Sequence, residues 1–68
     1  MKLSIFIEKT NKKLALEVKE GILIEEVLNQ LGINKTTVLT AVNKGLVPED
    51  TKIKKGDSLE ILSVISGG

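Results

Sequence analysis

The 68-residue sequence has no cysteine, histidine, tryptophan or tyrosine, and only one phenylalanine. Without cysteine it has no disulfide, no thiolate metal site and no cysteine nucleophile. Without histidine it lacks the side chain best suited to proton transfer near neutral pH, which is also the commonest metal ligand. We therefore expect a protein that is not an enzyme and that binds no metal and no cofactor of its own.

The net charge of the sequence does not indicate binding to nucleic acid or to a membrane. Ten lysines against nine acidic residues give a formal net charge of +1. The lysine clusters at 12–13 and 52–55 come without arginine for base contacts and without tyrosine or tryptophan for stacking. No apolar run reaches the ~20 residues of a membrane span, and no signal peptide is visible. We expect a soluble, cytoplasmic protein on which other proteins act.

The apolar content is that of a folded chain, and its length suits one small domain. Leucine, isoleucine and valine make up 24 of the 68 residues. Residues 2–8 alternate between apolar and polar, which predicts a half-buried strand. After a polar turn at 9–13, residues 14–18 alternate again, so that residues 2–18 are predicted to form a hairpin.

The apolar period then changes from that of a strand to that of a helix. Ile24, Val27, Leu28 and Leu31 recur at the spacing of one helical stripe. Gly32 supplies the left-handed residue that ends such a helix. The sequence therefore predicts one short helix with a single apolar face.

Three more strands are predicted after the helix. The β-branched run 37–43 is the first, and Asn43-Lys44-Gly45 is a turn in which we expect positive φ at Gly45. A short return strand at 46–47 and a last strand at 58–66 follow. The predicted order is β-β-α-β-β-β, an α+β domain over residues 1–66 with one helix packed on one sheet.

The sequence closes with Ser66-Gly67-Gly68, which has two interpretations. One is a frayed end, since termini are often poorly ordered. The other is a flexible tail at 67–68 that threads the carboxylate into a narrow channel of another protein, because glycine has no side chain. A terminal carboxylate with a pKa near ~3.5 is an anion at neutral pH and needs activation before anything is attached to it.

The last predicted strand also carries apolar residues on its solvent side. The alternation that points Leu59 and Ile61 into the core turns Leu62 and Val64 outward. Phe6 lies outward on the first strand in the same way. Scattered exposed apolar residues are normal, but three on one face of so small a sheet also fit a docking patch for a partner.

Several short motifs occur in a distinctive order along the whole chain. They are Glu20-Gly21, Ala41-Val42-Asn43, Val47-Pro48, Gly56-Asp57 and the closing Val64-Ile65-Ser66-Gly67-Gly68. Together they resemble the ubiquitin-like β-grasp sulfur carriers of the ThiS and MoaD type, with their archaeal small-modifier relatives. The resemblance implies a mixed sheet of four to five strands on one helix, with the first and last strands parallel and adjacent. Phe6, Leu62 and Val64 would then share the face opposite the helix.

The resemblance also implies a function. An E1-like enzyme would use ATP to adenylate Gly68, and a sulfur donor would convert it to a thiocarboxylate that supplies sulfur for thiamine-type cofactor synthesis or tRNA thiolation. Gly67 and Ser66 would be recognised as the tail, and the outward face would dock the partner enzymes. The ATP belongs to the activating enzyme.

The sequence departs from the family pattern at two places. Ile22-Leu23 replace a threonine-rich helix start. The approach to the tail lacks the proline typical of molybdopterin-synthase small subunits, which favours thiamine-type or tRNA-thiolation carriers.

Two alternative functions stay open. One alternative is a ubiquitin-like modifier, in which Gly68 is joined to lysines of target proteins. The other is a non-catalytic β-grasp binding domain, against which the missing aromatic residues count.

Overall fold

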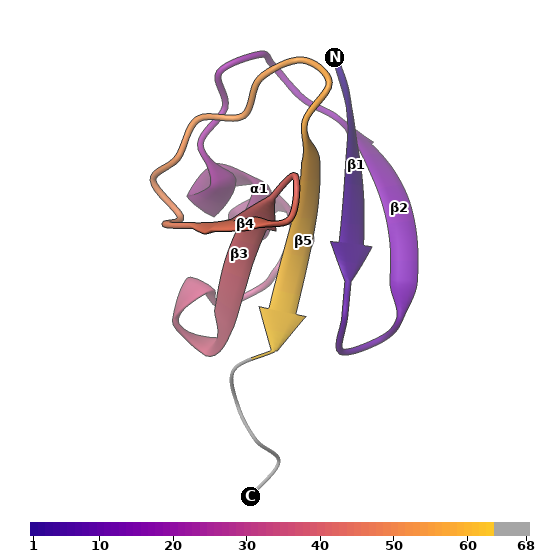
Figure 1. Ribbon diagram of the computed structural model, residues 1–68, viewed down its shortest axis with the longest axis vertical. Helices are drawn as coiled ribbons and strands as arrows, with labels where there is room; N and C mark the ends of the chain where they lie inside the picture. The colour runs from indigo at the N-terminus through magenta and orange to yellow at the C-terminus, as the bar shows by residue number, and fades with distance from the viewer. Residues whose placement is uncertain (64–68) are drawn as a thin grey trace, which may run out of the picture.

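The computed structural model describes residues 1–63 as one sheet with one α-helix on it (Figure 1). The elements are β1 (Lys2–Ile7), β2 (Lys12–Glu17), α1 (Ile24–Leu31), the 3₁₀ turn η1 (Lys35–Thr37), β3 (Val38–Val42), β4 (Gly45–Val47) and β5 (Ser58–Ser63). Apart from the short η1, this is the predicted order of strands and helix. The predicted last strand runs on to residue 66, and its final residues lie outside the described part.

The sheet is mixed, with strand order β2-β1-β5-β3-β4. β1 pairs with β2 antiparallel and with β5 parallel, while β3 pairs antiparallel with both β5 and β4. The first and last strands are therefore parallel neighbours, as the resemblance implied. β5 consequently occupies the middle of the sheet, although it is the last of the elements in residues 1–63.

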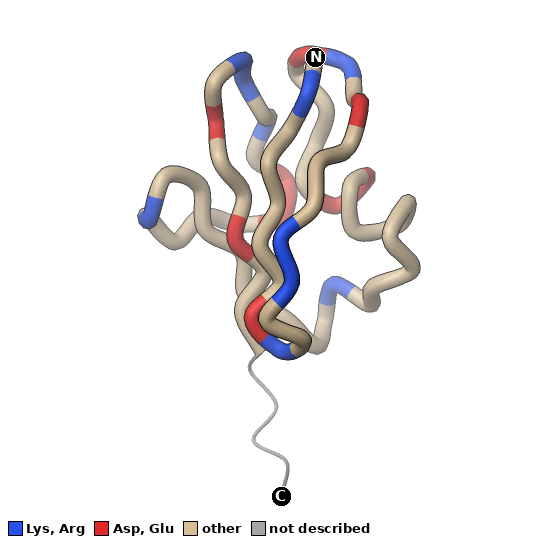
Figure 2. The backbone as a smooth tube through the Cα atoms, turned by 90° about the vertical axis from the view of Figure 1, so that its right-hand side faces the viewer, with Lys and Arg blue, Asp and Glu red and all other residues tan. Residues whose placement is uncertain are grey.

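The core lies between the sheet and α1. Its buried members are Leu3, Ile5, Val18, Ile24, Val27, Leu28, Ile53, Leu59 and Ile61. Most of them follow the predicted alternation and helical stripe. Ile53 is the exception, because it comes from the irregular segment between β4 and β5 and is nevertheless fully buried. Lysines and acidic residues are interspersed along the chain around this core (Figure 2).

The segment that carries Ile53 also supplies the missing cap of α1. Leu23 occupies the N-cap and has no side-chain oxygen for the first turn, but the Glu26 carboxylate accepts from its backbone N–H at 3.1 Å. Two further N–H groups of the helix start, on Ile24 and Glu25, donate to carbonyls at Thr51 (3.0 Å) and Glu49 (2.8 Å). Hydrogen bonds to a distant segment thus satisfy backbone N–H groups of the first turn that the side chain of a capping serine or threonine would otherwise satisfy.

The other end of α1 closes as predicted. Gly32 has φ +72°, and its N–H donates to the Asn29 carbonyl at 3.1 Å. The N–H of Ile33 donates to the Leu28 carbonyl at 2.9 Å. This is the left-handed helix ending that glycine adopts without a Cβ clash. α1 has eight residues, and within residues 1–63 no helix is long and apolar enough to span a membrane.

The turn between β3 and β4 differs from the prediction. Positive φ occurs at Asn43 (+52°) and Lys44 (+72°), not at Gly45. Val42 and Gly45 pair directly across the hairpin, so the loop has two residues, and the favoured two-residue turn needs positive φ at both of them. The expectation for Gly45 was therefore wrong, because it placed the pairing of the strands one residue too late.

Candidate functional site

The predicted site residues fall into two groups. Gly68, Gly67, Ser66 and Val64 lie outside the described residues, so their predicted roles rest on sequence alone. The described chain ends with β5, whose last residue is Ser63. The described part of the candidate site therefore consists of the surfaces that surround this end of β5.

Phe6 and Leu62 lie on the sheet face opposite α1, as predicted. Phe6 pairs with Glu60 between β1 and β5, and Leu62 follows two residues later on the same side of β5. Leu59 and Ile61, which alternate with Glu60 and Leu62 along β5, point into the core and are buried. Both Phe6 and Leu62 are half-buried rather than fully exposed.

Two leucines that the sequence analysis did not single out extend this face. Leu39 on β3 lies directly opposite Leu62 on β5, and Leu46 on β4 lies opposite Ala41. Leu39 is 48% exposed and Leu46 is 65% exposed, the two exposed large hydrophobic residues of the described chain. We call Phe6, Leu39, Leu46 and Leu62 the outer apolar face. The alternation of Val38, Thr40 and Val42 was the signal that turns Leu39 outward.

The end of β5 is held in place by the chain that leaves β1. The backbone N–H of Glu8 donates to the Ile61 carbonyl at 3.0 Å. The Glu8 carboxylate in turn accepts from the backbone N–H of Ser63 at 3.3 Å. Ser63, the last described residue, is therefore held next to Leu62 of the outer apolar face.

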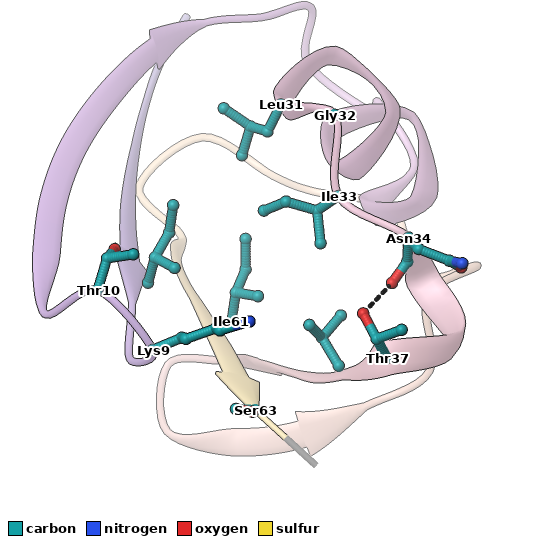
Figure 3. A pocket seen from close by; sticks show the side chains of 11 residues that line it. Lys9, Thr10, Leu31, Gly32, Ile33, Asn34, Thr37, Ile61 and Ser63 are labelled. Carbon is teal, nitrogen blue, oxygen red and sulfur yellow. Dashed lines mark hydrogen bonds between the residues drawn. The ribbon is translucent and has the colours of Figure 1, made fainter. Parts of the chain in front are cut away.

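A pocket of about 510 Å³ lies on the helix side of the same end of β5 (Figure 3). Its apolar lining comes from Ile7, Leu31, Ile33, Val38 and Ile61. Polar groups at its rim include Thr37, whose hydroxyl donates to the Asn34 carbonyl at 2.7 Å. Lys9 is the one titratable side chain among the lining residues, and most of the other side chains of the lining are apolar.

Two carboxylates form the ion pairs of the described chain. The N-terminal ammonium, 2.8 Å from the Glu17 carboxylate, holds the pKa of Glu17 below its usual value, and Lys2 adds to this effect. The Glu25 carboxylate, 3.1 Å from the Lys35 ammonium, raises the pKa of Lys35. Neither pair includes a residue of the outer apolar face or of the pocket, and residues 1–63 hold no cluster of potential metal ligands.

Comparison with protein families and curated proteins gives consistent matches. A model of the ThiS family matches residues 4–68. The sulfur carrier protein TtuB of Thermus thermophilus is 40% identical over 53 residues, which cover 78% of this chain and 82% of that protein.

Solved structures share the fold over the full length. The thiamine biosynthesis protein ThiS from Geobacter metallireducens superposes with a TM-score of 0.68 at 23% identity, covering all of both chains. A chain in the complex of subunits 1 and 2 of the molybdopterin-converting factor from Helicobacter pylori gives a TM-score of 0.71 at 17% identity, again over all of both chains. At these identities the likeness establishes the fold, and it confirms the predicted ubiquitin-like β-grasp.

Proposed function

Because the chain belongs to the ThiS family, we propose that it is a sulfur carrier protein. The family match is the observation that carries this proposal, since it extends to residue 68 and so includes Gly67 and Gly68. The match to the sulfur carrier protein TtuB at 40% identity supports the same function. In this proposal the chain is the substrate of its partners and not itself a catalyst.

The carrier chemistry takes place on the carboxylate of Gly68. An E1-like partner joins this carboxylate to the AMP unit of ATP and releases pyrophosphate, which gives the acyl group a good leaving group. The terminal sulfur of a donor's persulfide then displaces AMP, and a thiol reduces the acyl disulfide to a thiocarboxylate. This sequence uses no side chain of the carrier, in keeping with a chain that has neither cysteine nor histidine.

The rest of the chain presents this end to the enzymes. Ser66 and Gly67 supply reach and clearance in the channel of the activating enzyme. The outer apolar face docks that enzyme beside the fixed end of β5, and Val64 remains part of this docking surface as a prediction from the sequence. Sulfur then passes to an enzyme of thiamine-type cofactor synthesis or of tRNA thiolation, in the cytoplasm where ATP is present.

The test is the intact mass of the protein purified from its native host. We expect a fraction of the molecules to carry one oxygen-to-sulfur exchange, located by fragmentation at Gly68. A chain that lacks Gly68, and a chain extended beyond it, are the matched controls, and neither should be adenylated by the activating enzyme. Adenylation that persists in both controls would overturn the proposal.

The same measurement separates the carrier from a protein modifier. A modifier uses the same adenylate but forms an isopeptide bond between Gly68 and a lysine of a target protein. Conjugates that leave a diglycine remnant on lysines, with no thiocarboxylate, would assign the chain to that alternative function.

A further inference from the structure

The edge of the sheet formed by β2 is suited to pairing with a second copy of this chain. β2 has six residues and is the outermost strand on its side of the sheet. An edge strand leaves the N–H and C=O groups of alternate residues without a partner strand. The opposite edge, β4, has only three residues, so β2 is the longer template.

Charge is distributed unevenly along this edge. Lys12 and Lys13 stand at the beginning of β2 and Glu17 stands at its end. The tube in Figure 2, which is seen from the β2 side, accordingly carries both blue and red segments along this side. Lys13 and Glu17 both lie on the outer side of the sheet, because they pair with Phe6 and Lys2 of β1. Both are exposed, and the Glu17 side chain retains 75% of its accessible area despite its ion pair with the N-terminus.

Symmetry and side-chain direction leave few ways to pair β2 with itself. Residues directly opposite each other in an antiparallel pair point to the same face of the sheet. A symmetric pair must therefore be centred on one residue of β2 and not between two residues. Parallel pairing in register would set Lys13 against Lys13 of the second copy, so it is disfavoured.

Among the remaining registers, the one centred on Ala15 brings opposite charges of the two copies together. It sets Lys13 opposite Glu17 of the second copy, twice by symmetry, on the outer side. On the inner side it sets Leu14 opposite Leu16, and both of these leucines are half-exposed at this edge. A register centred on Leu14 would place Lys13 opposite Ala15 of the second copy, which offers no opposite charge. A register centred on Leu16 would place Lys13 opposite Lys19 of the second copy, which has the same charge.

We propose that two copies of this chain associate through β2 in the antiparallel register centred on Ala15, which joins their sheets into one. One edge strand buries less than the ~1,600 Å² of a standard interface, so the dimer is weak and forms in concentrated samples. β5 lies inside the sheet, away from this edge. The dimer thus leaves both outer apolar faces available to partner enzymes.

The test is self-association measured by analytical ultracentrifugation and NMR over a concentration series. Lys13→Glu alone and Glu17→Lys alone set like charges opposite each other and should each weaken association about tenfold. An equal mixture of these two variants places opposite charges at both positions and should restore association to the parent level. Lys12→Glu is the matched control, since it makes the same change in net charge on the inner side and should leave association unchanged.

Three results would overturn the proposal. The first is a parent chain that stays monomeric at millimolar concentration, and the second is a mixture of the two variants that remains monomeric although both variants are folded. The third is concentration-dependent NMR shifts at Leu39 and Leu46 in place of β2. Glu17→Lys also removes the ion pair with the N-terminus, so if this variant unfolds, the comparison of Lys13→Glu with Lys12→Glu still decides the question.

Discussion

Asn43 links two turns that are distant in the sequence. Its side-chain oxygen accepts from the backbone N–H of Ser58 at 3.1 Å, and its side-chain nitrogen donates to the Asp57 carboxylate at 3.1 Å. Asp57 also accepts from the backbone N–H of Lys54 at 2.8 Å. Asparagine tolerates the left-handed region that this position requires, whereas the neighbouring Lys44 adopts it at a cost.

This difference predicts opposite effects of substitution at the two turn positions. Lys44→Gly should raise the free energy of unfolding by up to about 1 kcal/mol, because Asn-Gly is the preferred pair for this turn. Asn43→Ala should lower it by about 1–2 kcal/mol, through loss of its hydrogen bonds and strain at positive φ. Urea titrations of both variants check the prediction, and a destabilised Lys44→Gly would contradict the turn assignment.

A pH dependence follows from the ion pair of Glu17. Its pKa is lower in the folded chain than in the unfolded one, because the folded chain places the N-terminal ammonium beside the carboxylate. Its stabilising effect is therefore complete above the unfolded pKa of about 4.3 and disappears as the pH falls through the folded pKa. Glu17→Gln should thus melt at a lower temperature than the parent at pH 7, and the difference should vanish at strongly acidic pH.

Glu20→Gln is the matched control for this prediction. It removes the same charge from a residue that forms no ion pair among those of residues 1–63. A Glu20→Gln variant with the same pH-dependent loss would show that net charge, and not the pair with the N-terminus, causes the effect.

At the scale of elements, α1 shows how a helix with a poor local start is held by its surroundings. Its eight residues are too few for a helix that is stable alone. Two features stabilise it. One is the buried stripe of Ile24, Val27 and Leu28, and the other is the set of backbone hydrogen bonds between its first turn and the segment before β5. The helix therefore forms together with the core.

Leu28→Ala tests this dependence. Leu28 is 1% exposed, and removal of a buried leucine side chain costs about 2–5 kcal/mol. That is a large fraction of the stability of so small a domain, so the variant should be largely unfolded at ambient temperature. Asn29→Ala, at the exposed neighbouring position, is the control and should melt close to the parent. Parent-like melting of Leu28→Ala would show that the helix does not anchor the core.

At the scale of the whole molecule, the two sides of the sheet differ in what they contact. One side carries the core and α1, and the other carries the outer apolar face beside the end of β5. In the proposed carrier function the second side docks the activating enzyme. Leu39 is a better probe of docking than Leu62, because Leu62 is half-buried in the free protein.

Leu39→Glu should therefore separate binding from folding. At a 48% exposed position the new carboxylate stays hydrated in the free protein, so the melting temperature should change little. In the complex it would be buried without a partner, which should weaken binding to the activating enzyme at least about tenfold. Ser4→Glu, on the same side of the sheet but outside the apolar face, is the control. Full binding by Leu39→Glu would exclude this face as the docking surface.

The sequence by itself determined the order of the helix and strands, the phase of β1, β2, β5 and α1, and the ending of α1 at Gly32. These features depend on short-range periodicity and on the conformational freedom of one glycine, and both can be recognised in a single sequence. Alternation turned Phe6 and Leu62 outward on their own strands. Their position on one face also needed the parallel pairing of β1 with β5, which the family resemblance implied and the structure confirms.

Only the tertiary structure decided which residues meet across elements. Periodicity orients a side chain relative to its own strand, but its exposure depends on the neighbouring strands and on what covers them. For this reason the burial of Ile53, the exposure of Leu46 and the capping of α1 by a distant segment were not predicted. The order of strands in the sheet, set by contacts between distant parts of the chain, left β2 at an edge and fixed β5 at the centre.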